Sequence, residues 1–127
     1  MLGQQNPQTV YRRIDFDARV STADPGELVN LCYEQLISAL GTALFAAERH
    51  DNRMKSAALT RAIAALTTLQ LGVSGQGEIA GALHQLYDAA RRSVLDSVLQ
   101  FEPGTIATIR RDFVDIDRVL GAARHTR

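Results

Sequence analysis

Four segments of the chain place apolar residues at alternating steps of three and four positions, which is the period of an amphipathic α-helix. Alanine and leucine together outnumber valine and isoleucine by more than two to one, and the three prolines lie outside or at the edges of these segments. The sequence therefore predicts an all-α chain, with helices over residues 25–49, 54–72, 79–101 and 106–120.

The ends of the predicted helices carry residues suited to capping. Asp24 can cap the first helix, Pro25 suits its first turn, and Glu27 stands where a capping-box side chain reaches back. Polar turns are expected at residues 50–52 and 102–105. The second helix is expected to reach Gly72, and 72–77 is a glycine-rich connection. The glycine cluster from Gly75 to Gly81 is expected to end one helix and to start the next, since glycine adopts the left-handed cap conformation without steric cost.

Short connections between the predicted helices favour antiparallel neighbours. We therefore expect an antiparallel four-helix bundle over residues 20–124, preceded by an N-terminal arm or short helix over residues 1–19. The arm carries Val10, Tyr11 and Ile14 at helical spacing, too short a stretch to be stable without a surface to bind.

Charge and cysteine content narrow the classes of function. The 127 residues carry 14 basic and 14 acidic side chains, so the formal net charge is zero. Nucleic-acid binders need uncompensated Lys and Arg, so this balance argues against that class and weakens a membrane-surface interpretation. The N-terminus has no signal-peptide core, no apolar run suits a membrane span, and a single cysteine cannot form an internal disulfide. We expect a cytoplasmic protein without membrane insertion.

No pattern in the sequence is typical of a catalytic or cofactor site. Gly75, Gly77 and Gly81 are misplaced for a dinucleotide-binding loop and follow no predicted strand. His84 and Asp88, one helical turn apart, are the best pair of metal ligands, but two ligands make a weak site. We expect a protein that is not an enzyme, with no cofactor and no metal.

The reactive and charged side chains have ordinary structural interpretations. Cys32 lies on the apolar stripe of the first helix, where a free thiol behaves as a small core residue. Arginine doublets stand at 12–13, 91–92 and 110–111, with aspartates within one helical turn of them. Solvated ion pairs are the expected role of these doublets, in preference to phosphate binding.

Several short motifs occur in the order and spacing of one known family. Residues 21–29 read Ser-Thr-Ala-Asp-Pro-Gly-Glu-Leu-Val, followed by Cys-Tyr-Glu at 32–34. Gly-Glu-Ile-Ala at 77–80 precedes Leu-Tyr-Asp at 86–88 and the arginine pair at 91–92. Over residues 20–122 the chain resembles the flagellar secretion chaperone FliS family.

This resemblance implies a four-helix export chaperone. Such a protein binds the disordered C-terminal segment of flagellin, prevents its premature polymerisation and helps to deliver it to the flagellar type III export gate. The bundle would hold this client in apolar grooves, as a monomer or a weak homodimer. The candidate groove or arm residues are Tyr11, Ile14, Pro25, Leu28, Tyr33, Ile37, Ile79, Leu83 and Tyr87.

Helix packing suggests how such a client could bind. Wide apolar stripes leave exposed grooves if the bundle buries only its central seam. A set of alanines would either let a client helix approach closely or serve tight internal packing, and the sequence leaves both open. These alanines are Ala39, Ala43, Ala46, Ala47, Ala57, Ala58, Ala64 and Ala65.

Two questions about partners stay open at this level. The bundle could instead be a regulatory or scaffolding protein that dimerises through the same grooves, or a histidine phosphotransfer bundle acting through His84. The arm could cover an empty groove through Tyr11, so that flagellin would have to displace it, or it could be an inert tail.

Overall fold

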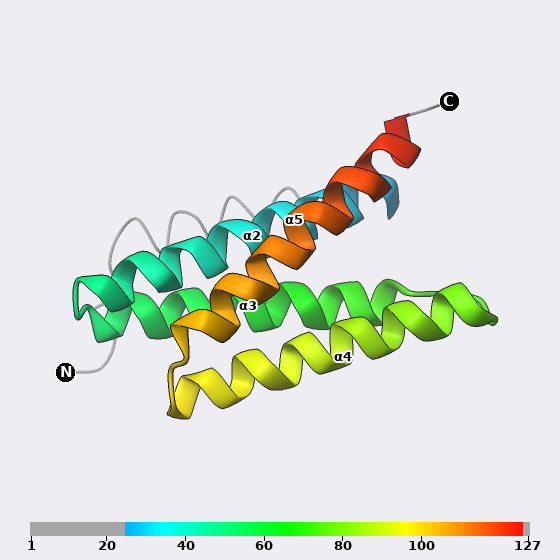
Figure 1. Ribbon diagram of the computed structural model, residues 1–127. Coiled ribbons are helices and arrows are strands. Elements are labelled where there is room, and N and C mark those ends of the chain that lie inside the picture. The colour runs from blue at the N-terminus through cyan, green and yellow to red at the C-terminus, as the bar shows by residue number, and fades with distance from the viewer. Residues whose placement is uncertain (1–24, 126–127) are drawn as a thin grey trace.

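The computed structural model describes residues 25–125, which form four α-helices packed as an antiparallel bundle (Figure 1). The helices are α2 (Pro25–Glu48), α3 (Asn52–Gly72), α4 (Glu78–Leu99) and α5 (Pro103–His125). This part of the chain contains no strand, and the predicted all-α bundle is confirmed. The expected boundary at residue 19 and the arm before it, with Tyr11 and Ile14, lie outside the described residues.

The last helix begins earlier than the sequence indicated. Pro103, placed in a turn by the prediction, is the first residue of α5, and the N–H of Ile106 donates to the carbonyl of Glu102 at 3.1 Å. Proline suits a first helical turn because its missing N–H would have had no partner there. The third helix also ends slightly early, at Leu99 rather than near Phe101.

The two connections around α3 differ in how they stop the helix. Asp51 caps α3, where its Oδ1 accepts from the N–H of Met54 at 3.0 Å. At the other end α3 reaches Gly72, as predicted, and is followed by Val73 in extended backbone. Positive φ values of 84° and 122° occur at Gly75 and Gly77, within the connection. Only glycine adopts such backbone without strain, and Gly77 then starts α4.

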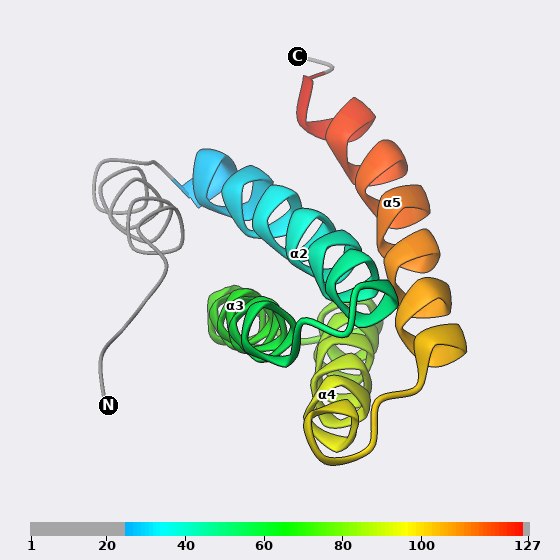
Figure 2. The same ribbon diagram turned by 90° about the vertical axis from the view of Figure 1, so that its left-hand side faces the viewer.

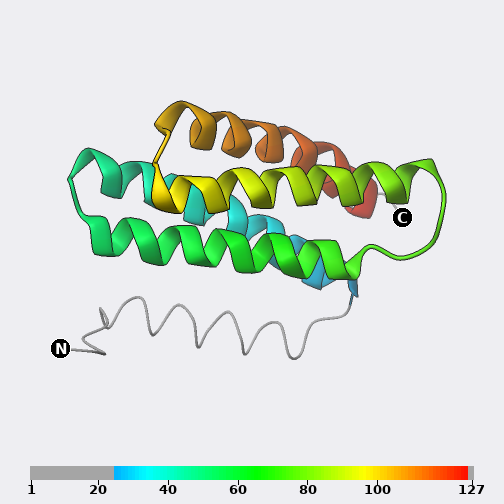
Figure 3. The ribbon, with the colours of Figure 1, turned by 90° about the horizontal axis from the view of Figure 1, so that it is seen from below.

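The helices do not pack equally on one another. α2 lies against both α3 and α5, and α3 and α4 run side by side (Figure 3). α5 packs mainly along α2 and has little contact with α4 (Figure 2). The bundle is therefore tight on the α2–α3 side and loose between α4 and α5.

Alanines close the tight side of the bundle. Of the eight alanines named from the sequence, five are at most 1% exposed: Ala39, Ala43, Ala46, Ala58 and Ala65. Small side chains let helix backbones approach closely, so tight internal packing is the role of these five. Ala64 is exposed, and Ala47 and Ala57 are half-buried.

The most apolar helix owes its composition to the core. The stretch Gly26–Glu48 has the length and hydropathy of a membrane span when those properties are taken alone. Tyr33, Leu36 and Leu40 from this helix are fully buried among the other three helices. Core packing therefore accounts for the apolar character of α2.

Candidate binding site

An apolar cavity of about 320 Å³ lies at the end of the bundle where residues 73–77 join α3 to α4. We call this cavity the apolar pocket and this end of the bundle the open end. Side chains from all four helices form its walls. The lining residues are Leu28, Val29 and Cys32 of α2, Thr68, Leu69 and Gly72 of α3, Val73 and Ser74 of the connection, Leu83 and Tyr87 of α4, and Leu120 of α5.

The pocket has a half-buried rim and a fully buried floor. Leu28, Leu83 and Leu120 are half-buried, whereas Cys32 and Tyr87 are 1% and 3% exposed. Aliphatic side chains that the protein does not cover retain apolar surface that a partner can remove from water. The pocket is thus suited to bind apolar side chains of another segment.

Cys32 forms part of this apolar wall. Burial raises the pKa of its thiol from 9.0 to about 11, so the side chain is a neutral thiol at physiological pH. A reactive cysteine needs a lowered pKa and access to solvent, and Cys32 has neither. The expected role as a core residue is confirmed.

The floor of the pocket belongs to an aromatic cluster of Tyr33, Tyr87 and Phe113. The ring centroids of Tyr33 and Tyr87 lie 6.4 Å apart, and Phe113 of α5 lies 5.8 Å from Tyr33 and 6.2 Å from Tyr87. The two hydroxyl groups are hydrogen-bonded at 2.8 Å. Buried tyrosines need such partners, and this bond joins α2 to α4 across the core.

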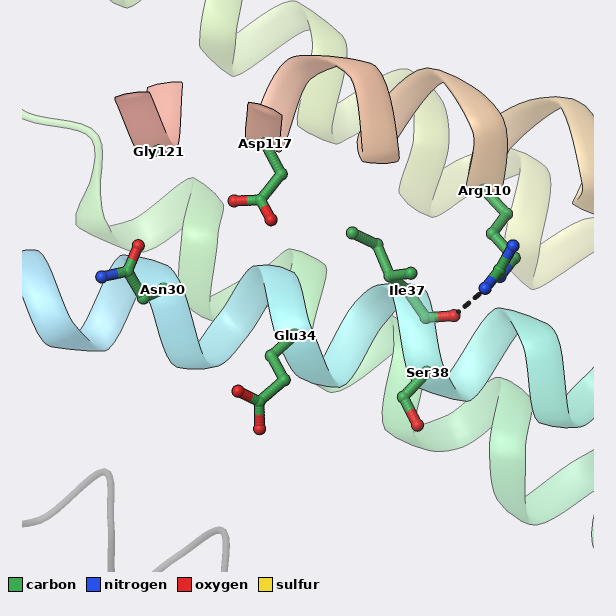
Figure 4. A pocket seen from close by; sticks show the side chains of 7 residues that line it. All are labelled: Asn30, Glu34, Ile37, Ser38, Arg110, Asp117 and Gly121. Atoms are coloured by element: carbon green, nitrogen blue, oxygen red, sulfur yellow. Dashed lines mark hydrogen bonds between the residues drawn. The ribbon is translucent and has the colours of Figure 1, made fainter. Parts of the chain in front are cut away.

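A second cavity, of about 740 Å³, lies between α2 and α5 and is more polar (Figure 4). We call it the α2–α5 groove. Figure 4 shows Asp117 directed from α5 toward α2, and the side chain of Ile37 directed toward α5. The groove is lined by Asn30, Glu34, Ile37, Ser38, Arg110, Asp117 and Gly121.

Arg110 fastens α5 to α2 beside this groove. Its Nε donates to the carbonyl oxygen of Ile37 at 3.2 Å, which differs from the solvated ion pair that the sequence predicted for the 110–111 doublet. The close approach depends on Gly41, since a Cβ at that position would lie 3.1 Å from the Arg110 Nε. A glycine in a helix interior lowers helix propensity, and here it makes room for a guanidinium.

The arginine pair on α4 matches its prediction. Arg92 and Arg91 both pair with Asp88, at 3.0 Å and 3.7 Å, and all three side chains are partly exposed. Exposed ion pairs of this kind contribute little to stability. Each of the two guanidinium groups thus has a carboxylate partner in Asp88, as the sequence predicted.

Three of the nine candidate residues from the sequence meet in the apolar pocket. Leu28 and Leu83 form its rim and Tyr87 its floor. Tyr33 is fully buried beside Tyr87, where it supports the pocket from below. These positions come from α2 and α4, which the fold brings together.

The other described candidates lie elsewhere. Ile37 lines the α2–α5 groove, and Ile79 is 80% exposed near the start of α4. Pro25 is the first residue of α2.

No sequence pattern placed Cys32 or Leu120 at a binding site. Both were assigned to core stripes, and helical periodicity alone cannot tell a filled core from a pocket wall. The contact between Arg110 and Ile37 was also missed. Its sequence signal was Gly41, a glycine inside a helical pattern, which often marks a close approach of another group.

The described bundle combines an apolar pocket with side chains that offer no metal centre. Among residues 25–125 no group of three or more His, Cys, Asp or Glu side chains could hold a metal ion. His84 is exposed on α4, and His50 lies in the turn after α2. The fold and pocket thus define a helical protein suited to bind an apolar segment.

Comparison with known proteins identifies the family. The family described as Flagellar protein FliS matches residues 7–120, and the chain belongs to this family. A relative from Bacillus subtilis (strain 168), named flagellar secretion chaperone FliS, is 26% identical over 105 residues. That match covers 83% of this chain and 76% of the relative.

Proposed function

We propose that this chain is a cytoplasmic flagellar export chaperone that binds the disordered C-terminal segment of flagellin, in part through the apolar pocket. The observation that carries this proposal is the pocket itself, which is open, apolar and lined by all four helices. Membership of the FliS family and the name of the Bacillus subtilis relative support the export role. Binding would keep the client from polymerising early and present it to the export gate.

The chemistry of the pocket favours an amphipathic client segment. Its rim offers aliphatic surface at Leu28, Leu83 and Leu120, and no charged side chain lines it. Leu71 at the end of α3 and Ile79 at the start of α4 are 81% and 80% exposed, and both flank the connection at the open end. They would lengthen the client surface beyond the pocket.

The affinity should come from a long interface. A disordered client must be ordered on binding, which offsets about 2–5 kcal/mol of the contact energy. One small pocket cannot supply a tight complex by itself. The pocket therefore acts as one anchor among several apolar contacts, without catalysis, cofactor or metal.

The test compares two leucines of α4. Leu83→Ser removes apolar surface from the pocket rim, whereas Leu99→Ser changes a side chain that is 93% exposed at the other end of the same helix. We expect Leu83→Ser to weaken binding of a labelled flagellin C-terminal peptide at least about tenfold, which corresponds to about 1.4 kcal/mol. Leu99→Ser should leave binding unchanged. Fluorescence anisotropy measures both, and circular dichroism verifies that both variants fold.

Different outcomes separate this proposal from the alternatives. Equal affinity for both variants would exclude the pocket as a client site. Self-association without any capture of flagellin would favour the scaffolding protein, whereas the chaperone should be a monomer or weak homodimer that captures flagellin through its C-terminal segment. Phosphate acceptance that is abolished by His84→Gln would favour the phosphotransfer bundle.

The N-terminal arm is a further part of this proposal. Val10, Tyr11, Ile14 and Phe16 could cover apolar client surface in the free chaperone, so that flagellin has to displace them. Deletion of the residues before Asp17 should then tighten flagellin binding and increase self-association. An inert tail would change neither quantity, and weaker binding would mean that the arm itself contacts the client.

A further inference from the structure

Exposed apolar side chains gather at the C-terminal end of α4. Leu95, Val98 and Leu99 are 41%, 47% and 93% exposed, and we call these three residues the α4 patch. Single exposed leucines are common on protein surfaces, but large apolar side chains that lie together form a surface that a partner can cover. The α4 patch lies at the end of α4 away from residues 73–77, and so away from the apolar pocket.

The bundle itself does not cover this patch. α4 packs on α3, has little contact with α5, and forms one edge of the bundle (Figures 1 and 2). Its buried residues in this region are Val94 and Ser97. Leu95 and Leu99 lie one turn apart on a different side of the helix, which faces away from the core.

The charges along α4 form two regions of opposite sign. Asp88 is shared by Arg91 and Arg92, at 3.7 Å and 3.0 Å, so two basic side chains surround one acidic side chain. The last turn contains Asp96 and no basic residue. The carbonyl groups at a helix C-terminus add partial negative charge. The helix is therefore positive just before the α4 patch and negative at its end.

Two further charged residues near this end have opposite signs. Glu102 follows α4 in the chain and is exposed. Lys55 of α3 places its ammonium over the ring of Phe101 at 4.9 Å. Because these two charges offset each other, the negative character of the helix end is that of Asp96 and the carbonyl groups.

A second copy of the chain matches both the apolar and the charged features. In a two-fold dimer, residue i of one copy contacts residue j of the other, and j contacts i. If two α4 helices pack antiparallel about residue 97, Leu95 of each copy lies level with Leu99 of the other. Arg92 of each copy then lies beside the negative C-terminal end of the opposite helix. A parallel pair would instead bring like charges together.

We propose that the α4 patch is a self-association surface, through which two copies of the chain pair antiparallel along α4 with Arg92 of each beside the C-terminal end of the other. Stable interfaces bury about 800 Å² per partner, from about 20–30 residues a side, and this patch is much smaller. The dimer is therefore weak, and the apolar pocket of both copies stays free. The surface does not depend on flagellin, so it is tested separately from the proposed function.

Sedimentation equilibrium of the full chain, at concentrations up to about 1 mM, tests the surface with two matched variants of α4. Leu99→Ser removes an apolar side chain of the patch, whereas Ile79→Ser removes one that is 80% exposed at the other end of the same helix. Leu99→Ser should raise the dissociation constant of the dimer at least about tenfold, because the loss occurs twice in a two-fold dimer. Ile79→Ser should leave it unchanged. Circular dichroism verifies that both variants fold.

A charge reversal tests the direction of the two helices. Arg92→Glu places a carboxylate beside the C-terminal end of the opposite helix, and should raise the dissociation constant about tenfold at low salt. Arg118→Glu is the control, since Arg118 also forms an exposed ion pair, with Asp115 of α5 at 3.6 Å. It should not change the dissociation constant. Equal effects of the two reversals would contradict the antiparallel pair.

Three other results would overturn the surface. One is a chain that stays monomeric up to about 1 mM. Another is self-association that Ile79→Ser weakens and Leu99→Ser does not, since the contact would then lie at the open end. The third is loss of flagellin C-terminal peptide binding in Leu99→Ser, which would make the client the occupant of the patch. Failure of the peptide to bind any variant would contradict the proposed function, whereas dimerisation that Leu99→Ser alone weakens would still support the surface.

Discussion

The two ends of the bundle differ in how completely the apolar faces of the helices are covered. At the end that holds the α2–α3 turn, buried alanines such as Ala43, Ala46 and Ala58 let the helices approach closely. At the open end, leucines such as Leu28 and Leu83 remain half-buried around a cavity. Small residues close a bundle, whereas large residues that lack enough neighbours leave apolar surface for a partner.

The aromatic cluster marks the boundary between these two ends. Tyr87 belongs both to the cluster and to the floor of the pocket, and Phe113 is the last fully buried residue of α5 up to Gly121, where the described burial ends. The cluster thus separates the filled part of the core from the end that retains a cavity. The predictions below test whether the cluster has this role.

Removing the aromatic ring of α5 should produce the largest effect. Phe113→Ala should lower the free energy of unfolding by about 3–5 kcal/mol, since it leaves a cavity beside Tyr33 and Tyr87. Urea unfolding followed by circular dichroism measures this loss. Val119→Ala is the control and should change stability by less than about 0.5 kcal/mol. A loss below about 1 kcal/mol for Phe113→Ala would mean that the cluster is not the boundary.

The sequence predicted the helices and their order well because periodicity and capping are local properties. Three helix starts were near their predicted positions, and the error at Pro103 arose because proline serves both turns and first helical turns. Cys32 was correctly assigned to a buried position. These features depend on neighbours in the chain, which the sequence displays directly.

The pocket was only partly predictable because it depends on where helices diverge. Leu28, Leu83 and Tyr87 were named as candidates, but Leu120 was assigned to a packing seam and turned out to line the cavity. Apolar periodicity identifies the face that a helix turns toward its neighbours. It does not give the distance to those neighbours, which decides between a filled core and a pocket.

The pH dependence of the unfolding free energy should show whether water reaches the Cys32 thiol in the pocket wall. The folded-state pKa of the Cys32 thiol, about 11, lies above the ordinary 9.0, so the unfolded chain loses its proton first. The thiol therefore stabilises the fold below pH 9, and this contribution disappears as the pH rises from 9 to 11. The loss is about 2–3 kcal/mol.

The unsubstituted chain is compared with the Cys32→Ala variant, because the two proteins share every titrating group except the thiol. The difference in unfolding free energy between the unsubstituted chain and Cys32→Ala should shrink by that amount between pH 9 and pH 11. A difference that stays constant with pH would show that water reaches the thiol in the folded state. The open end would then be wetter than its burial indicates.

The hydrogen bond between Tyr33 and Tyr87 should contribute less to the unfolding free energy, and the contributions of the two hydroxyl groups should be coupled. Tyr33→Phe and Tyr87→Phe should each lower the unfolding free energy by about 1 kcal/mol, because each leaves the opposite hydroxyl with one partner fewer. The double variant should lose less than the sum of the two. Strict additivity in this double-mutant cycle would mean that the two hydroxyl groups are not coupled.

The smallest expected effect concerns Gly41, on the face of α2 that Arg110 of α5 approaches. Gly41→Ala gains helix propensity of about 1 kcal/mol, but its Cβ would press on the Arg110 Nε at 3.1 Å and disturb the bond to Ile37. The two effects oppose each other, so the net change in unfolding free energy should be within about 0.5 kcal/mol.

The same substitution should behave differently once the guanidinium is gone. In an Arg110→Ala background, Gly41→Ala should stabilise the protein by about 1 kcal/mol, because only the propensity gain remains. Gly81→Ala on α4, where a Cβ would meet nothing within 4 Å, is the matched control and should stabilise both backgrounds equally. If Gly41→Ala also has the same effect in both backgrounds, Arg110 does not press on α2 at this glycine. The boundary between the two ends of the bundle would then consist of the aromatic cluster without the arginine.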